Sequence, residues 1–191
     1  MAHVSIIGTG TMGQAISAVV TKGGNTAELL GRSDAGQPVT GDIVVLAVPY
    51  PALADVLAAC GDQLAGKIVV DITNPLDFQT FDSLTVPADS SAAAQIAAAL
   101  PRSTVLKAFN TNFAATLAAG TTGQVPATVM IAGDNTQAKA QLADVVTAAG
   151  LRAIDAGALR RARELEALGF LQLTLAAQQK MPWTGGFAVA A

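Results

Sequence analysis

The chain has 191 residues, of which 51% are hydrophobic and 13% are charged, and its formal net charge is −3. This composition favours a folded protein with a sizeable apolar core over a disordered chain. The weak negative charge and the low aromatic content, 4%, argue against nucleic-acid binding, which uses basic and stacking side chains.

The most apolar stretch, residues 167–177, is shorter than the roughly 20 residues that cross a bilayer, so we expect no membrane partner. Cys60 is the single cysteine, which permits no internal disulfide and suits a reducing compartment. The chain starts with a strand-like run at His3 rather than with a secretory leader. We therefore expect a cytoplasmic location.

Apolar runs of strand length alternate with longer helical stretches along the chain. The expected strands are residues 3–7, 26–30, 42–48, 67–72, 104–108, 127–132 and 152–154. The expected helices are residues 11–22, 52–59, 91–100, 135–149 and 158–180. This alternation predicts an α/β fold with a doubly wound, mostly parallel Rossmann-type sheet. We expect one compact domain over residues 1–191, with extra C-terminal strands and a C-terminal helix, and an irregular excursion at 78–87.

One connection is unusually short. Only residues 31–41 separate the second and third expected strands, whereas a parallel crossover normally takes a dozen or more residues. The segment has room for no more than a short edge strand around Val39. We expect the adenine end of a bound nucleotide to be comparatively open.

A G-x-G-x-x-G motif directly follows the first strand and opens the first helix. It is formed by Gly8, Thr9, Gly10, Thr11, Met12 and Gly13. Its glycines allow a tight turn, a close approach of the backbone to a pyrophosphate and close packing of the helix on the strand. The free N–H groups at the helix start then bind the diphosphate. This context predicts a dinucleotide-binding site.

The end of the second strand indicates which dinucleotide binds. An NAD site usually places an acidic residue there, but this chain has Arg32 followed by Ser33. Both side chains are suited to a 2′-phosphate, which favours NADP(H). Glu28 lies two residues too early, inside the strand, while Asp34 lies close enough to weaken the preference.

Few side chains are placed for acid–base chemistry. His3, the single histidine, opens the first strand and lies at the edge opposite the expected ligand. Tyr50 follows a strand and is placed to line the nicotinamide pocket. Asp71 is expected to organise a turn by hydrogen bonds. Lys107 is expected either to point into the site or to bind backbone and charged groups in a structural role.

We therefore predict no catalytic acid or base and no metal site. Such a site suits hydride transfer between two cofactors, because their rings carry the chemistry and the protein orients them.

Several blocks of the chain resemble NADPH-dependent reductases of the deazaflavin coenzyme F420. They are also similar to the NADPH-binding domain of the six-transmembrane ferric reductases. The blocks are residues 7–13, 31–33, 48–50, 73–76, 105–111 and 154–159, the last leading into 162–166, and the resemblance spans residues 3 to about 180. The 105–111 and 154–166 blocks are the most specific.

The resemblance implies that Thr9, Gly10, Thr11 and Met12 hold the diphosphate, and that Arg32 and Ser33 hold the 2′-phosphate. It further implies that Val48, Pro49 and Tyr50 flank the nicotinamide ribose. The cleft for the second ring would be walled by Asn74, Pro75, Ala108, Phe109 and Asn110. The implied activity is hydride transfer between NADP(H) and F420, in a homodimer. The 158–180 helix is expected either to contribute to the dimer contact or to pack on its own sheet.

The chain also departs from the archaeal F420 reductases. The segment after Arg32 is shorter, and Phe109-Asn110 is closer to the ferric reductase domains. The resemblance therefore supports NADPH binding more strongly than it supports the deazaflavin as the second substrate. The alternatives are an NADPH-dependent flavin (FMN or FAD) or ferric reductase, and a non-enzymatic NADPH sensor.

Overall fold

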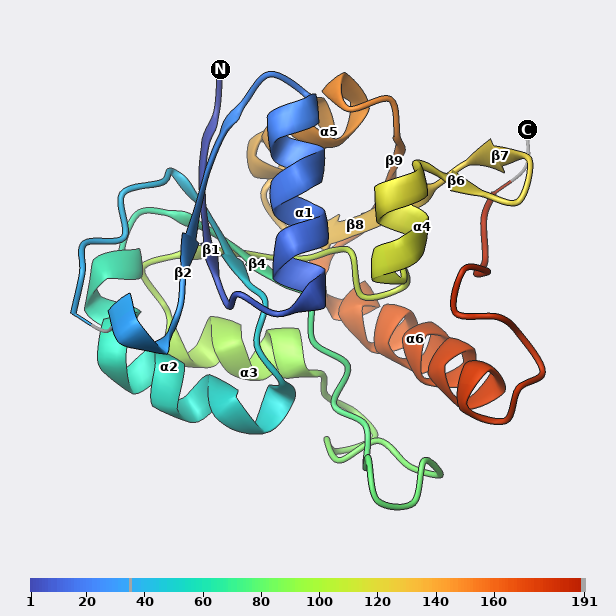
Figure 1. Ribbon diagram of the computed structural model, residues 1–191. Coiled ribbons are helices and arrows are strands. Elements are labelled where there is room, and N and C mark those ends of the chain that lie inside the picture. Colours follow the sequence, from blue (N-terminus) through green and yellow to red (C-terminus); the bar gives the residue numbers. More distant parts are fainter. Residues whose placement is uncertain (35, 190–191) are drawn as a thin grey trace.

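A seven-stranded sheet with the order β2-β1-β3-β4-β5-β8-β9 forms the centre of the computed structural model, which describes residues 1–34 and 36–189 (Figure 1). The strands are β1 (His3–Ile7), β2 (Thr26–Leu30), β3 (Ile43–Leu46), β4 (Ile68–Asp71), β5 (Thr104–Lys107), β8 (Thr128–Gly133) and β9 (Arg152–Gly157). The first five are parallel, β8 runs antiparallel to β5, and β9 is parallel to β8. This confirms the predicted α/β class and the mostly parallel sheet.

Helices cover both faces of the sheet. One face carries α1 (Thr11–Lys22), α4 (Ala114–Ala119) and α5 (Thr136–Ala148), and the other carries α2 (Leu53–Cys60) and α3 (Ala92–Ala99). The last helix, α6 (Ala162–Ala177), packs beside α3. Of the helices in the described part of the chain, none is long and apolar enough to cross a membrane.

The central strands are apolar throughout because both of their faces are buried. Along β3, Ile43 and Val45 pack into the core under α1 and α5, while Val44 and Leu46 pack into the core under α2 and α3. A strand with helices on both sides has no solvent-facing positions, so its sequence does not alternate.

Local signals place the helix ends as expected. The hydroxyl oxygen of Ser91 accepts a hydrogen bond from the backbone N–H of Ala94 and caps α3, and Asn135 caps α5 in the same way through Ala138. After α5, Gly150 adopts φ +82°, which ends the helix in a left-handed turn.

Three parts of the structure differ from the sequence-based expectation. No strand forms around Val39; the crossover contains the 3-10 turn η1 (Arg32–Asp34), and the Val39 N–H donates to the Gln63 side chain. The expected 158–180 helix begins with a separate turn, η4 (Leu159–Arg161), before α6. The short helix α4 and the hairpin of β6 (Thr121–Thr122) and β7 (Val125–Pro126) were not predicted, because they are too short for a periodic pattern.

A buried charged cluster joins several of these elements. The Lys107 ammonium at the end of β5 lies 2.7 Å from Asp71 on β4 and 2.8 Å from Glu166 on α6, and all three side chains have no solvent exposure. The Glu166 carboxylate also accepts the backbone N–H groups of Ala92 and Ala93, which are unpaired donors at the start of α3. Burial raises the pKa of Glu166, and the Lys107 charge offsets only part of that rise. We call Lys107, Asp71 and Glu166 the buried charge cluster.

We predict that Lys107→Met destabilises the protein by about 3–5 kcal/mol at neutral pH, because two buried carboxylates lose their cation. Lys107 offsets part of the rise in the pKa of Glu166, so its removal raises that pKa further. The variant therefore gains more stability than the original protein when Glu166 is protonated, and the loss should shrink as the pH falls from 7 toward 5. Urea unfolding at several pH values measures this.

Lys139→Met is the matched control for that variant. Lys139 pairs at 2.7 Å with Asp155, whose side chain is 55% exposed, so its replacement should cost far less. Equal losses for the two variants, or a loss for Lys107→Met that does not depend on pH, would contradict the assigned role of the cluster.

Candidate functional site: a dinucleotide cradle and an adjoining cleft

The glycine-rich loop lies where the order of the sheet reverses, between β1 and β3. A Cβ on Gly8, whose φ is +123°, would lie 2.1 Å from the carbonyl oxygen of Ala47, and a Cβ on Gly13 would lie 2.0 Å from the Gly8 oxygen. A Cβ on Gly10 would meet nothing within 4 Å. The loop is therefore tight at Gly8 and Gly13 and open at Gly10, next to the start of α1. No described side chain caps this end of α1, so its N–H groups remain available.

The end of β2 lies beside this loop and presents Arg32 and Ser33 to solvent. A Cβ on Gly31 would lie 3.3 Å from the Thr9 side chain, so the two loops are in contact. Asp34 turns back, and its carboxylate accepts the Gly31 N–H at 2.7 Å. The Arg32 guanidinium forms no ion pair with any described residue.

Glu28 is occupied elsewhere. Its carboxylate accepts hydrogen bonds from the Ser5 hydroxyl and from the backbone and hydroxyl of Thr40. Burial acts to raise the pKa of Glu28, but these hydrogen bonds outweigh it and lower the pKa below its usual value. Glu28 thus fixes the short crossover to β3 and is not placed to bind a ribose.

A cleft of about 580 Å³ adjoins the glycine loop at the carboxyl ends of four strands. Loop residues after β1, β3, β4 and β5 line it, and α4, α6 and the C-terminal segment complete the wall. The lining residues are Gly10, Thr11, Met12, Ala47, Val48, Pro49, Tyr50, Ile72, Thr73, Asn74, Phe78, Phe109, Asn110, Asn112, Phe113, Ala114, Ala115, Leu173 and Trp183. Its size lies within the range of small-molecule sites.

Two asparagines form one polar wall of the cleft. The Asn74 amide nitrogen donates to the Asn110 carbonyl at 2.8 Å, and the Asn110 amide donates to Asn74 Oδ1 at 2.9 Å and to the Leu165 carbonyl at 2.8 Å. A Cβ on Gly169 of α6 would lie 2.3 Å from Asn74 Oδ1. The missing side chain at Gly169 lets α6 pack directly against this pair.

Aromatic side chains surround the mouth of the cleft. Phe113 lies at the start of α4, and its ring centroid is 5.0 Å from that of Trp183 in the C-terminal segment. Trp183 is 52% exposed, and Phe78, from the excursion after β4, is 53% exposed. These side chains come from three separate parts of the chain and offer apolar surface to a planar ring.

Among the residues that line the cleft, Tyr50 is the one with an ionisable side chain, and its hydroxyl donates to Gln95 at 2.7 Å. Lys107 does not enter the cleft, which resolves the two sequence-based alternatives in favour of a structural role. Cys60 lies half-buried at the end of α2, and burial raises the pKa of its thiol. Within residues 1–34 and 36–189, no group of histidine, cysteine, aspartate and glutamate side chains could hold a metal ion.

The structure brings most of the predicted site residues together. Those in the cleft wall are Gly10, Thr11, Met12, Val48, Pro49, Tyr50, Asn74, Phe109 and Asn110. Gly8, Thr9, Gly13, Arg32 and Ser33 are not among the cleft-lining residues and lie in the glycine loop, α1 and η1.

Pro75 and Ala108 do not line the cleft. The Pro75 carbonyl anchors Thr85 at the base of the excursion, and Ala108 is fully buried in the core.

Sequence reasoning missed Thr73, Asn112, Phe113, Leu173 and Trp183. Thr73 could have been found, because it directly precedes Asn74 at the carboxyl end of a buried strand. Phe113, Leu173 and Trp183 reach the cleft only through the packing of α4, α6 and the C-terminal segment, so no local pattern marks them.

Comparison with known proteins links this geometry to one family. The family model described as "NADP oxidoreductase coenzyme F420-dependent" matches residues 28–75. The F420-dependent NADP reductase of Methanocaldococcus jannaschii is 29% identical over 87% of this chain and 76% of its own length. The enzyme of the same name from Methanothermobacter marburgensis is 31% identical over 76% of this chain and 67% of its own length.

Two further proteins are similar to the chain. The metalloreductase STEAP3 of Rattus norvegicus is 38% identical over 59% of this chain, which corresponds to only 22% of that protein. A crystal structure from Arthrobacter sp. FB24 superposes with a TM-score of 0.86 at 24% identity, covering 100% of both chains, and so supports the fold. The similarity to the archaeal enzymes shows that the chain belongs to the family of F420-dependent NADP reductases.

Proposed function

We propose that the protein is an oxidoreductase that transfers a hydride between NADP(H) and coenzyme F420. The observation that carries this proposal is the cleft beside the glycine loop, whose lining has no ionisable side chain except Tyr50. Reduction of F420 by NADPH moves a hydride from the nicotinamide to the deazaflavin and takes up one proton, which water can supply. The protein needs to bind and orient two rings and to exclude competing acceptors.

The residues of the chain divide these tasks. The N–H groups at the start of α1 would bind the diphosphate, and Arg32 with Ser33 would bind the 2′-phosphate. Val48, Pro49 and Tyr50 line the cleft, and the nicotinamide ribose would lie against them. Phe109, Phe113 and Trp183 also line the cleft and would receive the deazaflavin.

A flavin is the second candidate for the acceptor. The similarity to part of STEAP3, a metalloreductase, favours this alternative, and the polar wall of the cleft includes Asn110 within the block that resembles the ferric reductase domains. The tricyclic rings of FMN and FAD are close in shape to the deazaflavin, so an assay has to separate them.

The direct assay follows the loss of the visible absorbance of F420 with NADPH, beside parallel reactions with FMN, FAD and FAD plus ferric iron. We expect the highest kcat/KM for F420. Turnover with the flavins alone would replace F420 with a flavin, and tight NADPH binding without turnover of any acceptor would indicate a sensor.

We further propose that the protein is a cytoplasmic homodimer and that residues 1–191 form one domain. The exposed Leu171 on α6, with the exposed Phe187 in the C-terminal segment, supports an apolar contact between two copies. The single free thiol of Cys60 suits a reducing compartment. Light scattering coupled to gel filtration should give twice the chain mass, and Leu171→Lys should give the mass of one chain.

We predict that Arg32→Ala weakens NADPH binding about 10- to 100-fold and leaves NADH binding nearly unchanged, because only NADPH carries the phosphate. Titration calorimetry with both dinucleotides measures the difference. Equal losses for NADPH and NADH, or no loss, would remove Arg32 from the phosphate site.

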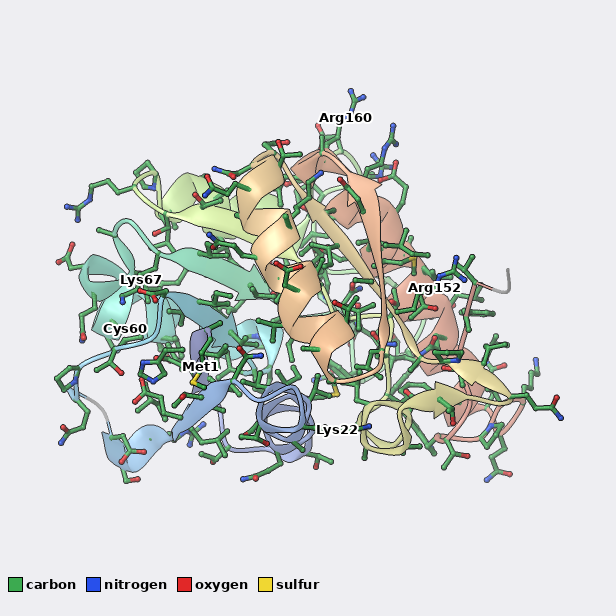
Figure 2. All side chains as sticks on the ribbon, turned by 90° about the horizontal axis from the view of Figure 1, so that it is seen from above. Met1, Lys22, Cys60, Lys67, Arg152 and Arg160 are labelled. Atoms are coloured by element: carbon green, nitrogen blue, oxygen red, sulfur yellow. The ribbon has the colours of Figure 1, made fainter. Side chains whose placement is uncertain are left out.

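Arg160→Ala is the matched control for Arg32→Ala. Figure 2 shows Arg160 projecting outward at the edge of the molecule opposite the blue N-terminal elements, among which Arg32 lies. Arg160 is exposed like Arg32, so its removal changes the net charge by the same amount without touching the site. Affinity for NADPH should stay within about twofold of the original protein.

A further inference from the structure

The backbone of Thr73, in the wall of the cleft, is held on both sides. Its backbone N–H donates to Asp71 Oδ1 at 2.8 Å, and its carbonyl accepts the Lys107 ammonium at 2.5 Å. Both polar groups of its backbone are therefore bound by members of the buried charge cluster. Since Lys107 also binds Asp71 and Glu166, Thr73 is fixed relative to β4, β5 and α6 at once.

The hydroxyl of Thr73 is left without a partner. The residue is 4% exposed and lines the cleft, yet its Oγ1 is buried and forms no hydrogen bond with any described residue. Buried hydroxyl groups nearly always have a partner, because an unpaired one loses its hydrogen bonds to water without replacement. Because Thr73 lines the cleft, a ligand bound there is a source of the missing partner.

Two other buried side-chain oxygens, Asn112 Oδ1 and Thr128 Oγ1, also lack partners among the described residues. They belong to neighbours that are already joined, because the Asn112 amide donates to the Thr128 carbonyl at 2.9 Å. Local adjustment between those two side chains can satisfy them. The polar groups next to Thr73 are already bonded: the three N–H groups of Lys107 bind Asp71, Glu166 and the Thr73 carbonyl, and the Asp71 oxygens accept from Lys107 and the Thr73 N–H. We therefore take the Thr73 hydroxyl as the candidate for a ligand contact.

The charge cluster gives a reason for this arrangement. Burying three charged groups is costly, and apolar side chains of similar volume often stabilise a core as well or better. Buried ionic groups are retained in some proteins because they fix one conformation. Here the groups bound by the cluster include the N–H and C=O of Thr73, a residue of the cleft wall.

We propose that the Thr73 hydroxyl forms a hydrogen bond with an amide group on one of the two rings that exchange the hydride. This bond sets the position of that ring. The inference rests on the proposed function, which places two amide-bearing rings in this cleft: the nicotinamide with its carboxamide and the deazaflavin with its pyrimidine ring. A threonine hydroxyl both donates and accepts, so it can bind either the C=O or the N–H of an amide.

Thr73→Val and Thr73→Ser test the proposal. Valine keeps the shape and removes the hydroxyl, while serine keeps the hydroxyl. The unliganded Thr73→Val protein should melt at or above the temperature of the original protein, because an unpaired hydroxyl is removed. For Thr73→Val, either the Kd for NADP+ or the KM for F420 should rise about 3- to 10-fold. For Thr73→Ser, both values should stay near those of the original protein.

The Kd for NADP+ and the KM for F420 together identify which ring carries the amide that Thr73 binds. A weaker Kd for NADP+, with an unchanged Kd for 2′,5′-ADP, which lacks the nicotinamide, assigns the contact to the carboxamide. An unchanged Kd for NADP+ with a raised KM for F420 at saturating NADPH assigns it to the deazaflavin.

Unchanged values in both arms overturn the proposal. So does a lowered melting temperature of unliganded Thr73→Val with full affinity, because that result assigns the hydroxyl to the fold. The measurement of the Kd for NADP+ needs no turnover, so it can be made even if F420 is not a substrate. If F420 is not a substrate, an unchanged Kd for NADP+ overturns the proposal by itself.

Discussion

The Lys107 ammonium joins the segments that surround the inner end of the cleft. It holds Asp71 at the end of β4, the carbonyl of Thr73 in the following loop and Glu166 on α6, while Glu166 holds the first N–H groups of α3. Each partner is satisfied by the others, and no water is needed to complete the cluster. The same buried charge cluster therefore holds the edge of the sheet, the polar wall of the cleft and the last helix.

This support explains how one sheet can form two adjoining subsites. The glycine loop and Arg32 lie on one side of the point where the strand order reverses, and the ends of β4 and β5 lie on the other. The glycine at position 169 brings α6 against the Asn74–Asn110 pair, so the last helix forms part of the cleft wall. Because the charged groups face inward, the cleft itself keeps few ionisable side chains, as hydride exchange between two rings requires.

Much of this arrangement was predictable from local patterns. The Gly8–Gly13 motif, the apolar β3 strand and the Ser91 cap each depend on neighbouring residues, and the structure has them where they were expected. The sequence left the role of Lys107 open, because its partners lie 36 and 59 residues away. Trp183 could not be assigned to the site either, because it reaches the cleft through the path of the chain after α6.

Transfer of a label from NADPH to F420 tests the central claim most directly. NADPH carrying deuterium at C4, prepared separately in each of its two stereochemical forms, is mixed with F420 and the protein in ordinary water. The account predicts that one form delivers its deuterium to the reduced deazaflavin without dilution by solvent hydrogen, because the two rings meet in one cleft. Reduced deazaflavin that contains only solvent hydrogen with both forms would contradict direct transfer.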